Sequence, residues 1–473
     1  MQNKIEMHGY LGTNDYLSSI CRSVPKVAVL GDSIIDEYFS VTANRISPEF
    51  PIPVMESECI RPHRIMPGGA ANVCYQCKSF TPSVHFFGIL NEYAYEVFKD
   101  KMHVGSPVLA NHLNCKIPIK KRFYEGDFPL CRMDEESKNY NLRESDFLDS
   151  YSNILSKLDS TFDVAIFSDY SKGFFKSFDV GSFFKKLPNA LKIVDPKNGP
   201  LFKWKGCDII KPNSKEAEAI SGQKNWRSQA SYFSKETDCQ NVIITQGGEG
   251  VVGIIEGEFF EYRPDFDVKA NSVVGAGDCF ISVLAVCAAN SIPMEKCVEI
   301  AFKAGAKYVT NKHNDPVWPT DLIESKLVDA ALLADRNFKL CFTNGCFDII
   351  HSGHLNTLRF AKEKGEKLVV GLNSDSSVSK QKKDHPLINS FEQRVDVLES
   401  LEFVDYIVAF SEETPKELIE KIKPDVLVKS EEYSKDPLYP PVGYDIAKET
   451  YFAPILENFS TSNIIKNIKN NNT

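Results

Sequence analysis

Two histidines three residues apart, His351 and His354, are the side chains whose type and spacing point most directly to chemistry. They follow the stretch TNGCFD and stand where a helix is expected to begin, next to Gly353. The N-terminus of a helix offers backbone N–H groups without partners and a partial positive charge, so it is a natural place for a phosphate. Imidazoles added there can stabilise the charge that builds on a triphosphate under attack. Two unrelated surface histidines are the alternative, but the strand, glycine turn and helix expected around the pair favour an active site.

A second candidate site is the turn Gly275-Ala276-Gly277-Asp278, which leads into an apolar helical pattern at 281–289. Its backbone N–H groups would form an anion hole for a transferring phosphoryl group, while the Asp278 carboxylate accepts a proton from a substrate hydroxyl. The tetrapeptide alone is weak evidence, because aspartate is common at helix starts for structural reasons. Its value depends on the loops that precede it in the chain.

The elements that must position these residues are visible as short apolar runs. Runs at 26–30, 164–167, 191–194 and 242–245 have the character of parallel strands buried on both faces. The segments between them are long enough for crossover helices, so we expect a doubly wound α/β sheet with ligands at the carboxyl ends of its strands. Further runs at 339–343 and 369–372 flank the two histidines and predict a second, smaller, Rossmann-like α/β domain.

Length and composition narrow the class of protein. The 473 residues exceed one typical domain, and 42% of them are hydrophobic, so a large core is expected. A net charge of −9 gives no basic surface for nucleic acid, which favours small anionic ligands held by local Lys and Arg clusters. The chain shows no N-terminal apolar signal segment and no apolar run long enough to span a membrane, so we expect a cytoplasmic protein with no membrane partner.

Thirteen cysteines are scattered, mostly singly, as is typical of reduced thiols in a cytosolic protein. One pair, Cys74 and Cys77, has C-x-x-C spacing on an expected helix. No second pair follows at zinc-site spacing, so we interpret them as small core residues and predict no metal site built by the protein alone.

Six loops precede the second motif in the chain: GDSIID (31–36), PGGAAN (67–72), SDYSKG (168–173), DPK (195–197), KPNSKE (211–216) and TQGGEG (245–250). In this order they resemble the loops of ribokinase-type sugar kinases. The resemblance implies that Asp278 is the catalytic base and that Gly275, Ala276 and Gly277 form the anion hole. The implied ATP-binding residues are Asn213, Ser214, Lys215, Glu216 and Gly248, and the implied sugar-binding residues are Asp32, Asp36, Arg45, Gly68, Gly69 and Asn72.

The HSGH motif, the strand and turn VGLNSD (370–375) and the run STSNII (460–465) resemble the cytidylyltransferase-like family, whose HxGH motif binds and activates a nucleoside triphosphate. The resemblance implies catalytic roles for His351 and His354. The implied nucleotide-binding residues are Thr343, Asn344, Gly345, Phe347, Asp348, Gly353, Asp375, Lys380, Arg394, Lys429, Ser460, Thr461 and Ser462.

The stretches NRISPE (44–49) and PIPV (51–54), together with the fusion of these two domain types, resemble the bifunctional enzymes of ADP-heptose synthesis. The expected parts are an N-terminal extension at 1–24, a kinase domain at 25–322, a helical linker at 323–337, a nucleotidylyltransferase domain at 338–468 and a polar tail at 469–473. The resemblance implies phosphorylation of D-glycero-β-D-manno-heptose 7-phosphate at C1, then adenylyl transfer from ATP to heptose 1-phosphate, which gives the lipopolysaccharide precursor ADP-heptose and pyrophosphate. It implies Mg²⁺ with ATP as cofactor and ATP and a sugar phosphate as partners, and it allows a homodimer through the kinase domain.

Three departures from the family patterns bear on specificity. The residues Ser272-Val273-Val274 stand where the kinases have Asp-x-Thr, which removes a carboxylate and a hydroxyl and argues against a monovalent-cation requirement. In the second domain, HPL (385–387) and KSEEY (429–433) replace Arg-Pro-Val and Lys-Gly-Gly-Asp-Tyr, which leaves the preferred sugar and base open.

Two alternatives therefore stay open: a kinase for another phosphosugar or polyol fused to a cytidylyltransferase, and a sugar-phosphate-binding protein with a decayed kinase half. The retained Asp278 argues against the second. A phosphorylated substrate also needs cations to receive its phosphate. The candidates are Lys116, Lys120, Lys121 and Arg122, with a solvated strand edge as the alternative interpretation.

Overall fold

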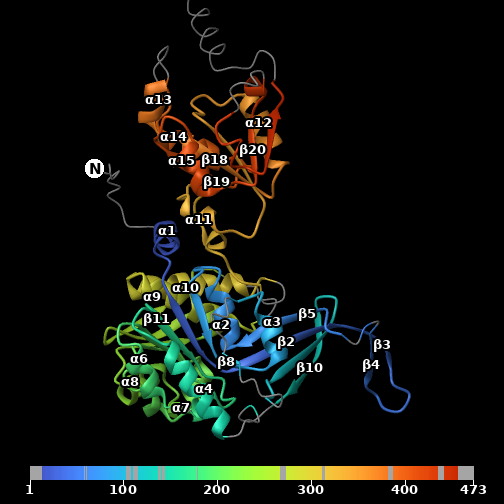
Figure 1. Cartoon of the computed structure of the whole chain (residues 1–473), viewed down its shortest axis with the longest axis vertical. Coiled ribbons are helices and arrows are strands. Elements are labelled where there is room, and N and C mark those ends of the chain that lie inside the picture. The colour runs from blue at the N-terminus through green and yellow to red at the C-terminus, as the bar shows by residue number, and fades with distance from the viewer. Residues whose placement is uncertain are drawn as a thin grey trace, which may run out of the picture. The chain divides into compact units, whose positions relative to one another are not determined.

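The computed structural model of the chain describes residues 13–455 except 58, 60, 103–107, 110–114, 137–139, 141–143, 178, 267–272, 312–314, 382–386 and 435–440. The chain forms two compact units (Figure 1). The first comprises Ser23–Asp321, and the second combines Leu322–Thr473 with the N-terminal Met1–Arg22. Within the described residues, no helix has the length and apolar character needed to cross a lipid bilayer.

An eight-stranded sheet forms the centre of the first unit, in the order β16-β15-β14-β13-β12-β11-β1-β6. Its strands are β1 (Val27–Gly31), β6 (Val84–Phe87), β11 (Val164–Ser168), β12 (Leu191–Asp195), β13 (Ile209–Ile210), β14 (Asn241–Thr245), β15 (Val251–Ile255) and β16 (Glu258–Tyr262). The strands from β6 to β14 run parallel, and β15 and β16 add an antiparallel edge. All four apolar runs predicted for this region are strands of the sheet, which confirms the α/β fold class.

Helices cover both faces of this sheet (Figure 1), as expected for strands such as β1 and β11 that are buried along their whole length. One face carries α2 (Ala70–Cys77), α9 (Ala276–Ala289) and α10 (Met294–Tyr308). The other carries α4 (Glu144–Lys157), α6 (Val180–Lys186), α7 (Ser214–Ser221) and α8 (Trp226–Thr237). Shorter elements are α3 (Glu92–Phe98), α5 (Phe174–Ser177) and the 3₁₀ turns η2 (Leu201–Trp204), η3 (Gly247–Glu249) and η4 (Pro319–Leu322).

The C-x-x-C pair lies in the buried part of α2. Cys74 and Cys77 are both inaccessible to solvent, and burial raises the pKa of both thiols, to about 12 for Cys77. Metal ligation and redox chemistry need the thiolate, which this environment disfavours. The interpretation as small core residues is confirmed.

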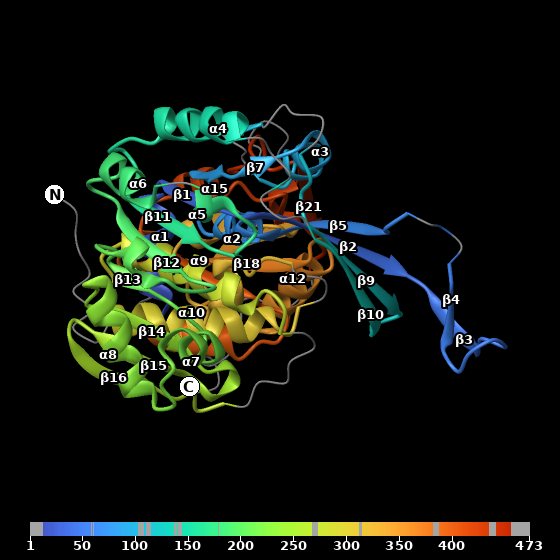
Figure 2. The same cartoon turned by 90° about the horizontal axis from the view of Figure 1, so that it is seen from below.

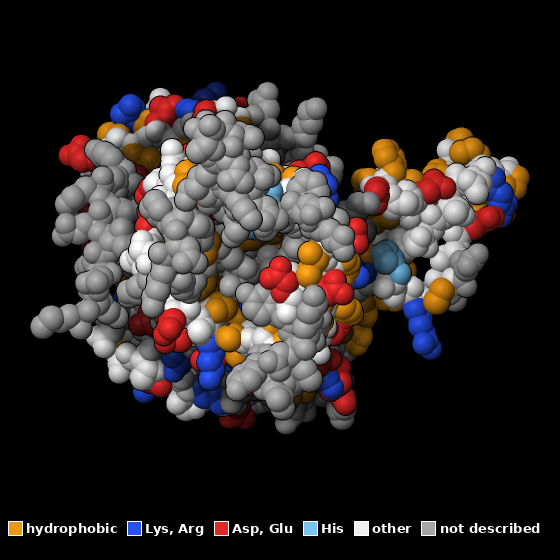
Figure 3. All heavy atoms as spheres, turned by 90° about the horizontal axis from the view of Figure 1, so that it is seen from above, with side chains coloured by type: hydrophobic (Ala, Val, Ile, Leu, Met, Phe, Trp, Pro, Cys, Tyr) orange, Lys and Arg blue, Asp and Glu red, His pale blue; other side chains and the backbone are white. Residues whose placement is uncertain are grey.

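A second sheet projects from the side of the first unit, in the order β10-β9-β2-β5 (Figure 2). Its strands are β2 (Ser33–Ser40), β5 (Arg64–Gly69), β9 (Ile119–Glu125) and β10 (Phe128–Glu135), and a short parallel pair, β7 (Ile89–Leu90) and β8 (Val108–Leu109), lies apart from it. No continuous apolar run marks this sheet in the sequence, because β2 (SIIDEYFS) and β9 (IKKRFYE) mix charged with apolar residues. Beyond it, β3 (Thr42–Ile46) and β4 (Pro53–Glu56) form a hairpin on which hydrophobic side chains are exposed (Figure 3).

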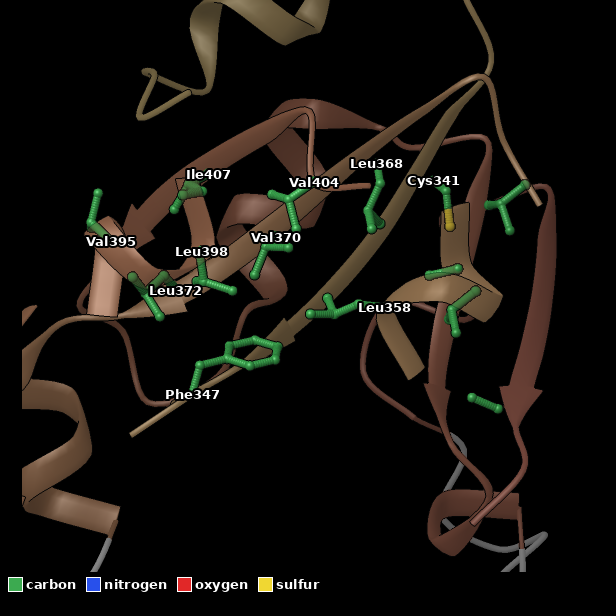
Figure 4. Close-up of a cluster of buried hydrophobic side chains, with 14 residues drawn as sticks. Cys341, Phe347, Leu358, Leu368, Val370, Leu372, Val395, Leu398, Val404 and Ile407 are labelled. Atoms are coloured by element: carbon green, nitrogen blue, oxygen red, sulfur yellow. The ribbon is translucent and has the colours of Figure 1, made fainter. Parts of the chain in front are cut away.

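The second unit is built on five parallel strands in the order β19-β18-β17-β20-β21. These are β17 (Leu340–Gly345), β18 (Lys367–Asn373), β19 (Tyr406–Phe410), β20 (Val426–Ser430) and β21 (Glu449–Ala453). Its helices are α11 (Ala331–Ala334), α12 (Ser352–Lys362), α13 (Asp375–Gln381), α14 (Phe391–Glu399) and α15 (Lys416–Ile422), with the 3₁₀ turn η5 (Glu431–Ser434). Apolar side chains of α12, α14 and the sheet, such as Leu358, Leu398 and Val370, form its core (Figure 4). The strand and helix predicted on either side of the histidines are β17 and α12.

The segment 323–337 is not the continuous helix that its apolar spacing predicts. Only α11 is helical, and Leu327 instead forms a parallel bridge with Ile407 of β19. The Val328 N–H donates to the Ile407 carbonyl at 2.9 Å. An edge strand offers unpaired backbone groups, and here they compete successfully with helix formation. The prediction of a helical linker is wrong for this reason.

The N-terminal segment contributes a helix, α1 (Thr13–Ser23), to the second unit. The Asn14 side chain accepts a hydrogen bond from the Glu324 N–H (3.1 Å) and donates to the Leu327 carbonyl (3.2 Å). The buried residues of α1 are Thr13, Leu17, Ser18 and Ile20. Residues expected to form an extension outside the domains therefore include part of a folded unit.

We predict that a fragment of residues 322–473 is less stable than the same fragment fused to residues 1–24 through a flexible linker. Burial of Leu17 and Ile20 is worth roughly 3–6 kcal/mol before the entropy of ordering the helix is subtracted. The midpoint of urea unfolding measures the difference, and a fusion carrying Leu17→Asn is the matched control. Equal midpoints for the fragment, the fusion and the control would contradict this role of α1.

Candidate active sites

The first candidate site forms around Asp278 in the first turn of α9. Its carboxylate is buried, with Oδ2 accepting a hydrogen bond from the Asn72 amide (2.7 Å) and Oδ1 accepting one from the Tyr170 hydroxyl. Burial raises the pKa of Asp278, while those hydrogen bonds and the ammonium groups of Lys211 and Lys120 oppose the rise. A carboxylate with a raised pKa is a stronger proton acceptor than an exposed one, which suits a general base.

The predicted anion hole is the N-terminus of α9, beside that carboxylate. Gly275 begins the helix with φ 85°, a left-handed conformation that suits glycine, and no side chain caps the helix. The Lys211 ammonium is ion-paired with Asp195 at 3.1 Å and lies 3.8 Å from where a Cβ on Gly277 would stand. Ala276 and its two neighbours are partly exposed, so an anion can reach this end of the helix. A cation and a helix N-terminus meet at one point, which favours phosphate there.

Asp36 of β2 lies in a buried ion pair with Arg122 of β9. Its Oδ1 accepts hydrogen bonds from Nη2 (2.7 Å) and Nε (3.2 Å) of the guanidinium group. On the neighbouring strand β5, a Cβ at Gly68 would stand 2.5 Å from Asp36 Oδ2, so only glycine fits beside the carboxylate. Lys120 is the register partner of Asp36, and its ammonium lies 5.8 Å from the ring centre of Tyr170, whose hydroxyl contacts Asp278, so the predicted sugar residue and the predicted base belong to one site.

The four cations predicted for a substrate phosphate fall on different sides of β9. Lys121 points away from Asp36 and pairs with Glu135, as alternation along a strand requires. Lys116 is exposed before the strand. Lys120 lies on the same face as Arg122, with its ammonium 5.8 Å from the centre of the Tyr170 ring, and burial lowers the pKa of Lys120. Lys120 and Arg122 therefore face the candidate site. Arg122 is engaged in the ion pair with Asp36, which leaves Lys120 as the candidate for a substrate phosphate.

Two predicted sugar-binding residues, Asp32 and Gly69, have structural roles within the protein itself. Asp32 is fully buried, and its carboxylate accepts four hydrogen bonds from the protein itself, so it has no place for a sugar hydroxyl. Gly69 adopts φ 62°, and a Cβ there would stand 2.6 Å from the Asp32 carbonyl oxygen. Glycine is needed at 69 for this close approach of two backbone segments.

The structure does not bring Arg45 to the site. It lies in the β3–β4 hairpin, exposed and paired with Glu56 at 2.8 Å, and the hairpin projects away from the eight-stranded sheet (Figure 2). A separate two-stranded sheet carries this residue, which the linear sequence does not reveal.

The residues predicted to bind ATP gather at neighbouring strand ends. Asn213 and Glu216 form a capping box at the start of α7: the Asn213 side chain accepts from the Glu216 N–H (2.9 Å), and the Glu216 carboxylate accepts from the Asn213 N–H (3.0 Å). Asn213 also bridges to Thr245, so this loop adjoins the turn η3 that contains Gly248. Ser214, Lys215 and Gly248 are exposed.

The second candidate site forms at the start of α12. His351 is its N-cap residue, and Nδ1 accepts a hydrogen bond from the Gly353 N–H at 3.2 Å, which leaves Nε2 to carry the proton. The rings of His351 and His354 lie 3.9 Å apart, and burial lowers the pKa of His351. Neutral His351 can therefore donate its Nε2–H to a phosphate, and its proximity to His354 disfavours two positive charges.

Lys429, at the end of β20, contacts Asn344 at the end of β17, the strand that precedes α12 in the chain. The strands β17 and β20 pair in parallel, and the Lys429 ammonium donates to the Asn344 side-chain oxygen. Burial lowers the pKa of Lys429 to about 8. A buried ammonium whose pKa is set by desolvation is stabilised when an anion binds next to it.

The predicted nucleotide residues Arg394 and Asp348 hold the loop after β17 in place. Arg394 is almost fully buried and donates to the Cys346 carbonyl (2.7 Å) and to Asp375 (2.6 Å). Asp348 accepts backbone N–H groups at 388 (3.1 Å) and 389 (2.9 Å). Phe347, which lies between Cys346 and Asp348 in the chain, adopts φ 47°, a backbone conformation that costs energy for a residue with a large side chain. The loop is shaped by these side chains, with Asp375 left about half exposed.

Other predicted nucleotide residues are placed by the same strand or are not described. Thr343 is buried in β17, and Gly345 ends that strand, where a Cβ would stand 3.0 Å from the Phe347 ring. Ser460, Thr461, Ser462, the side chain of Lys380 and Ser272 lie outside the described residues.

Sequence reasoning missed Tyr170, Lys211 and Asp195 as individual members of the kinase site. Each lies in a loop that the motif analysis singled out, SDYSKG, KPNSKE or DPK, so the loops carried the signal. The side chains could not be chosen, because their contacts with the α9 turn depend on the order of strands β11, β12 and β13 in the sheet.

Comparison with known proteins agrees with this geometry. Residues 193–321 match the model of the pfkB family of carbohydrate kinases, and residues 342–467 match the cytidylyltransferase-like model. Proteins named bifunctional protein HldE from Campylobacter jejuni and Wolinella succinogenes are each 33% identical, over 96% of this chain and 99% of theirs. The chain belongs to the HldE family. A solved mutant of phosphofructokinase-2 from Escherichia coli shares the fold of the first unit, with a TM-score of 0.50, 16% identity, and coverage of 63% of this chain and 97% of that one.

Membership of the HldE family makes the chain a bifunctional enzyme, a carbohydrate kinase joined to a nucleotidyltransferase, with heptose phosphate kinase and adenylyltransferase function. A decayed kinase half is not supported, because Asp278, the open end of α9 and Lys211 remain assembled.

We predict that binding of an anionic substrate to the second unit weakens as Lys429 loses its proton. The ammonium form, which attracts the anion, is present below a pH of about 8 and is lost above it. The KM for ATP or for the sugar 1-phosphate should therefore rise from about pH 8 upward, and in Lys429→Arg, whose charge persists, it should stay flat. Parallel KM profiles for parent and Arg variant would rule out this role.

Proposed function

We propose that the first unit transfers the γ-phosphoryl group of ATP to the C1 hydroxyl of D-glycero-β-D-manno-heptose 7-phosphate, and that the second transfers AMP from ATP to heptose 1-phosphate. The observation that carries the kinase proposal is the meeting of Asp278, the uncapped α9 N-terminus and Lys211. The pair His351 and His354, whose ring centres lie 3.9 Å apart at the start of α12, carries the transferase proposal.

In the kinase step, Asp278 takes the proton of the C1 hydroxyl. The hydroxyl oxygen attacks the γ-phosphorus, and ADP leaves. The α9 N-terminus and the Lys211 ammonium stabilise charge on the transferring group. Asp36 and Asn72 bind sugar hydroxyls, and Lys120 receives a substrate phosphate from the same face of β9.

Magnesium enters this step with ATP. Mg²⁺ prefers oxygen ligands and keeps several waters, so one or two carboxylates are enough to hold it. Asp195 and Glu216 provide such oxygens at adjoining strand ends, and both interact electrostatically with Lys211. They would hold a magnesium ion that neutralises part of the triphosphate charge, with Glu216 also paired with Lys197 at 2.7 Å. The side chain of Val274 offers no oxygen, so we propose no monovalent-cation requirement.

In the transferase step, an oxygen of the sugar 1-phosphate attacks the α-phosphorus of ATP and pyrophosphate leaves. His351, through Nε2–H, and His354 bind the phosphates, while Lys429 attracts the incoming anion. The acceptor of this step lacks the 7-phosphate of the kinase substrate, so a phosphatase reaction must lie between them. We further propose that the enzyme is cytoplasmic and that it forms a homodimer through its kinase unit.

The first test of the proposal concerns the base. Asp278→Asn should lower kinase turnover by roughly two to four orders of magnitude, because a positioned general base contributes about that much. The measurement is the rate of bisphosphate formation from heptose 7-phosphate. Adenylyl transfer to supplied heptose 1-phosphate by the same protein serves as the control for the amount of active chain. Kinase turnover at the parent rate would remove Asp278 from the mechanism.

The second test concerns the division of labour. His354→Ala should slow ADP-heptose formation from heptose 1-phosphate by roughly a hundredfold to a thousandfold, the usual loss for one donor to a developing negative charge. Bisphosphate formation from heptose 7-phosphate should continue at the parent rate. Both products can be followed by mass. If the substitution slows both reactions, or neither, the assignment of one reaction to each unit fails.

A further inference from the structure

Asp32 is a fully buried carboxylate that the mechanism above does not use. Its Oδ1 accepts hydrogen bonds from the Tyr140 hydroxyl (2.7 Å) and the Phe174 N–H (3.0 Å). Its Oδ2 accepts from the N–H groups of Tyr170 (2.9 Å) and Lys172 (3.2 Å). A carboxylate is costly to bury unless donors surround it, and here donors from separate segments of the chain converge on it.

Its place in the chain and its contacts with Ala70 and Tyr140 put Asp32 at the junction of the two sheets. It separates β1 from β2, so the chain leaves the eight-stranded sheet for the four-stranded one at this residue. Its carbonyl oxygen accepts a hydrogen bond from the Ala70 N–H (3.0 Å), where the chain returns from β5 into α2. Tyr140 lies in the segment after β10, the outer strand of the four-stranded sheet. Asp32 therefore anchors chain connections that leave and re-enter that sheet.

The contacts of Asp32 with Tyr170 and Lys172 fix the loop between β11 and α5. Ser171 in this loop has φ 57°, a left-handed conformation that is unfavourable for serine. The N–H groups of Tyr170 and Lys172, on either side of it, bind Asp32 and hold the turn. The hydroxyl of Tyr170 donates to Oδ1 of Asp278. One carboxylate thus fixes the backbone of the residue whose side chain contacts the base.

We propose that Asp32 is a positioning residue of the kinase reaction, which ties the junction of the four-stranded sheet to the loop that places the Tyr170 hydroxyl on Asp278. The proposal rests on the function proposed above, in which Asp278 is the base. Strand β2, which begins directly after Asp32, also carries Asp36. The strand that binds the sugar and the loop that orients the base share one anchor.

Substitution of Asp32 by asparagine tests this role directly. The amide keeps the size of the side chain but replaces an acceptor oxygen by a donor, so N–H groups that face it lose their partner. Kinase kcat should fall roughly tenfold to a hundredfold, the cost of a displaced catalytic contact. Adenylyl transfer by the same chain should stay at the parent rate.

Asp208→Asn is a control for the same chemical change at a less buried carboxylate of the same unit. Asp208 also accepts a backbone N–H group, from Lys192 at 2.7 Å, but it precedes β13 and lies at the opposite end of the strands from Asp278. The control should keep the parent kinase rate. A loss in the control as large as in Asp32→Asn would mean that any such substitution weakens the unit, and it would overturn the specific role.

A double-mutant cycle tests whether Asp32 acts through Tyr170. Tyr170→Phe removes only the hydroxyl that contacts Asp278. If one residue acts through the other, the double variant should be about as active as the worse single variant, whereas independent effects would multiply. Multiplied losses would overturn the proposal.

The pH dependence of kcat/KM supplies a readout that general destabilisation would not move. The Tyr170 hydrogen bond lowers the pKa of Asp278, so both single variants should shift the acid limb of the profile to higher pH. The other groups that act electrostatically on or with Asp278 are Asn72, Lys120, Asp195, Lys211, Cys279 and Tyr308. All of them are retained in both variants.

Two outcomes separate this inference from the function on which it rests. If Asp278→Asn keeps the parent turnover, the base assignment itself fails. If Asp278→Asn is inactive while Tyr170→Phe keeps the parent turnover and the parent acid limb, the base stands and the positioning role fails. Tyr170→Phe gives this answer even if Asp32→Asn does not fold.

Discussion

Both units depend on one physical arrangement, in which a parallel strand ends and the N-terminus of a helix directs backbone N–H groups to the same edge of the sheet. In the first unit this helix is α9, and in the second it is α12. An anion is favoured at each place before any side chain is added. The chemistry then depends on the few side chains brought there: Asp278 provides a proton acceptor, and His351 provides a neutral N–H donor.

The two sites solve the problem of a buried cation differently. Lys211 keeps its charge because Asp195 pairs with it at 3.1 Å, and the nearby carboxylates raise its pKa despite burial. Lys429 contacts the neutral Asn344, and burial lowers its pKa to about 8. The first ammonium is a permanent part of the phosphate site. The second gains most from an anion that arrives with the substrate, since that anion replaces the solvation lost on burial.

The parts of this fold that depend on local pattern could be predicted from the sequence, and the parts that depend on distant pairing could not. Apolar runs predicted β1, β11, β12, β14 and the elements around His351, because strands buried on both faces leave a clear signal. The segment 323–337 has helical spacing but pairs with the edge of β19, a partner far away in sequence. Likewise Asp32 belongs to a loop recognised as sugar-binding, yet only the folded chain brings Tyr140 and the Tyr170 loop onto its carboxylate.

The second unit also depends on contacts between residues that are far apart in the sequence. The second unit begins with α1, is interrupted by the whole kinase unit and resumes at Leu322, so Asn14 meets Ser325 across 311 residues. For a flexible loop the entropy cost of closure grows only with the logarithm of its length. The long kinase insert therefore adds little more to this entropy cost than a shorter insert would.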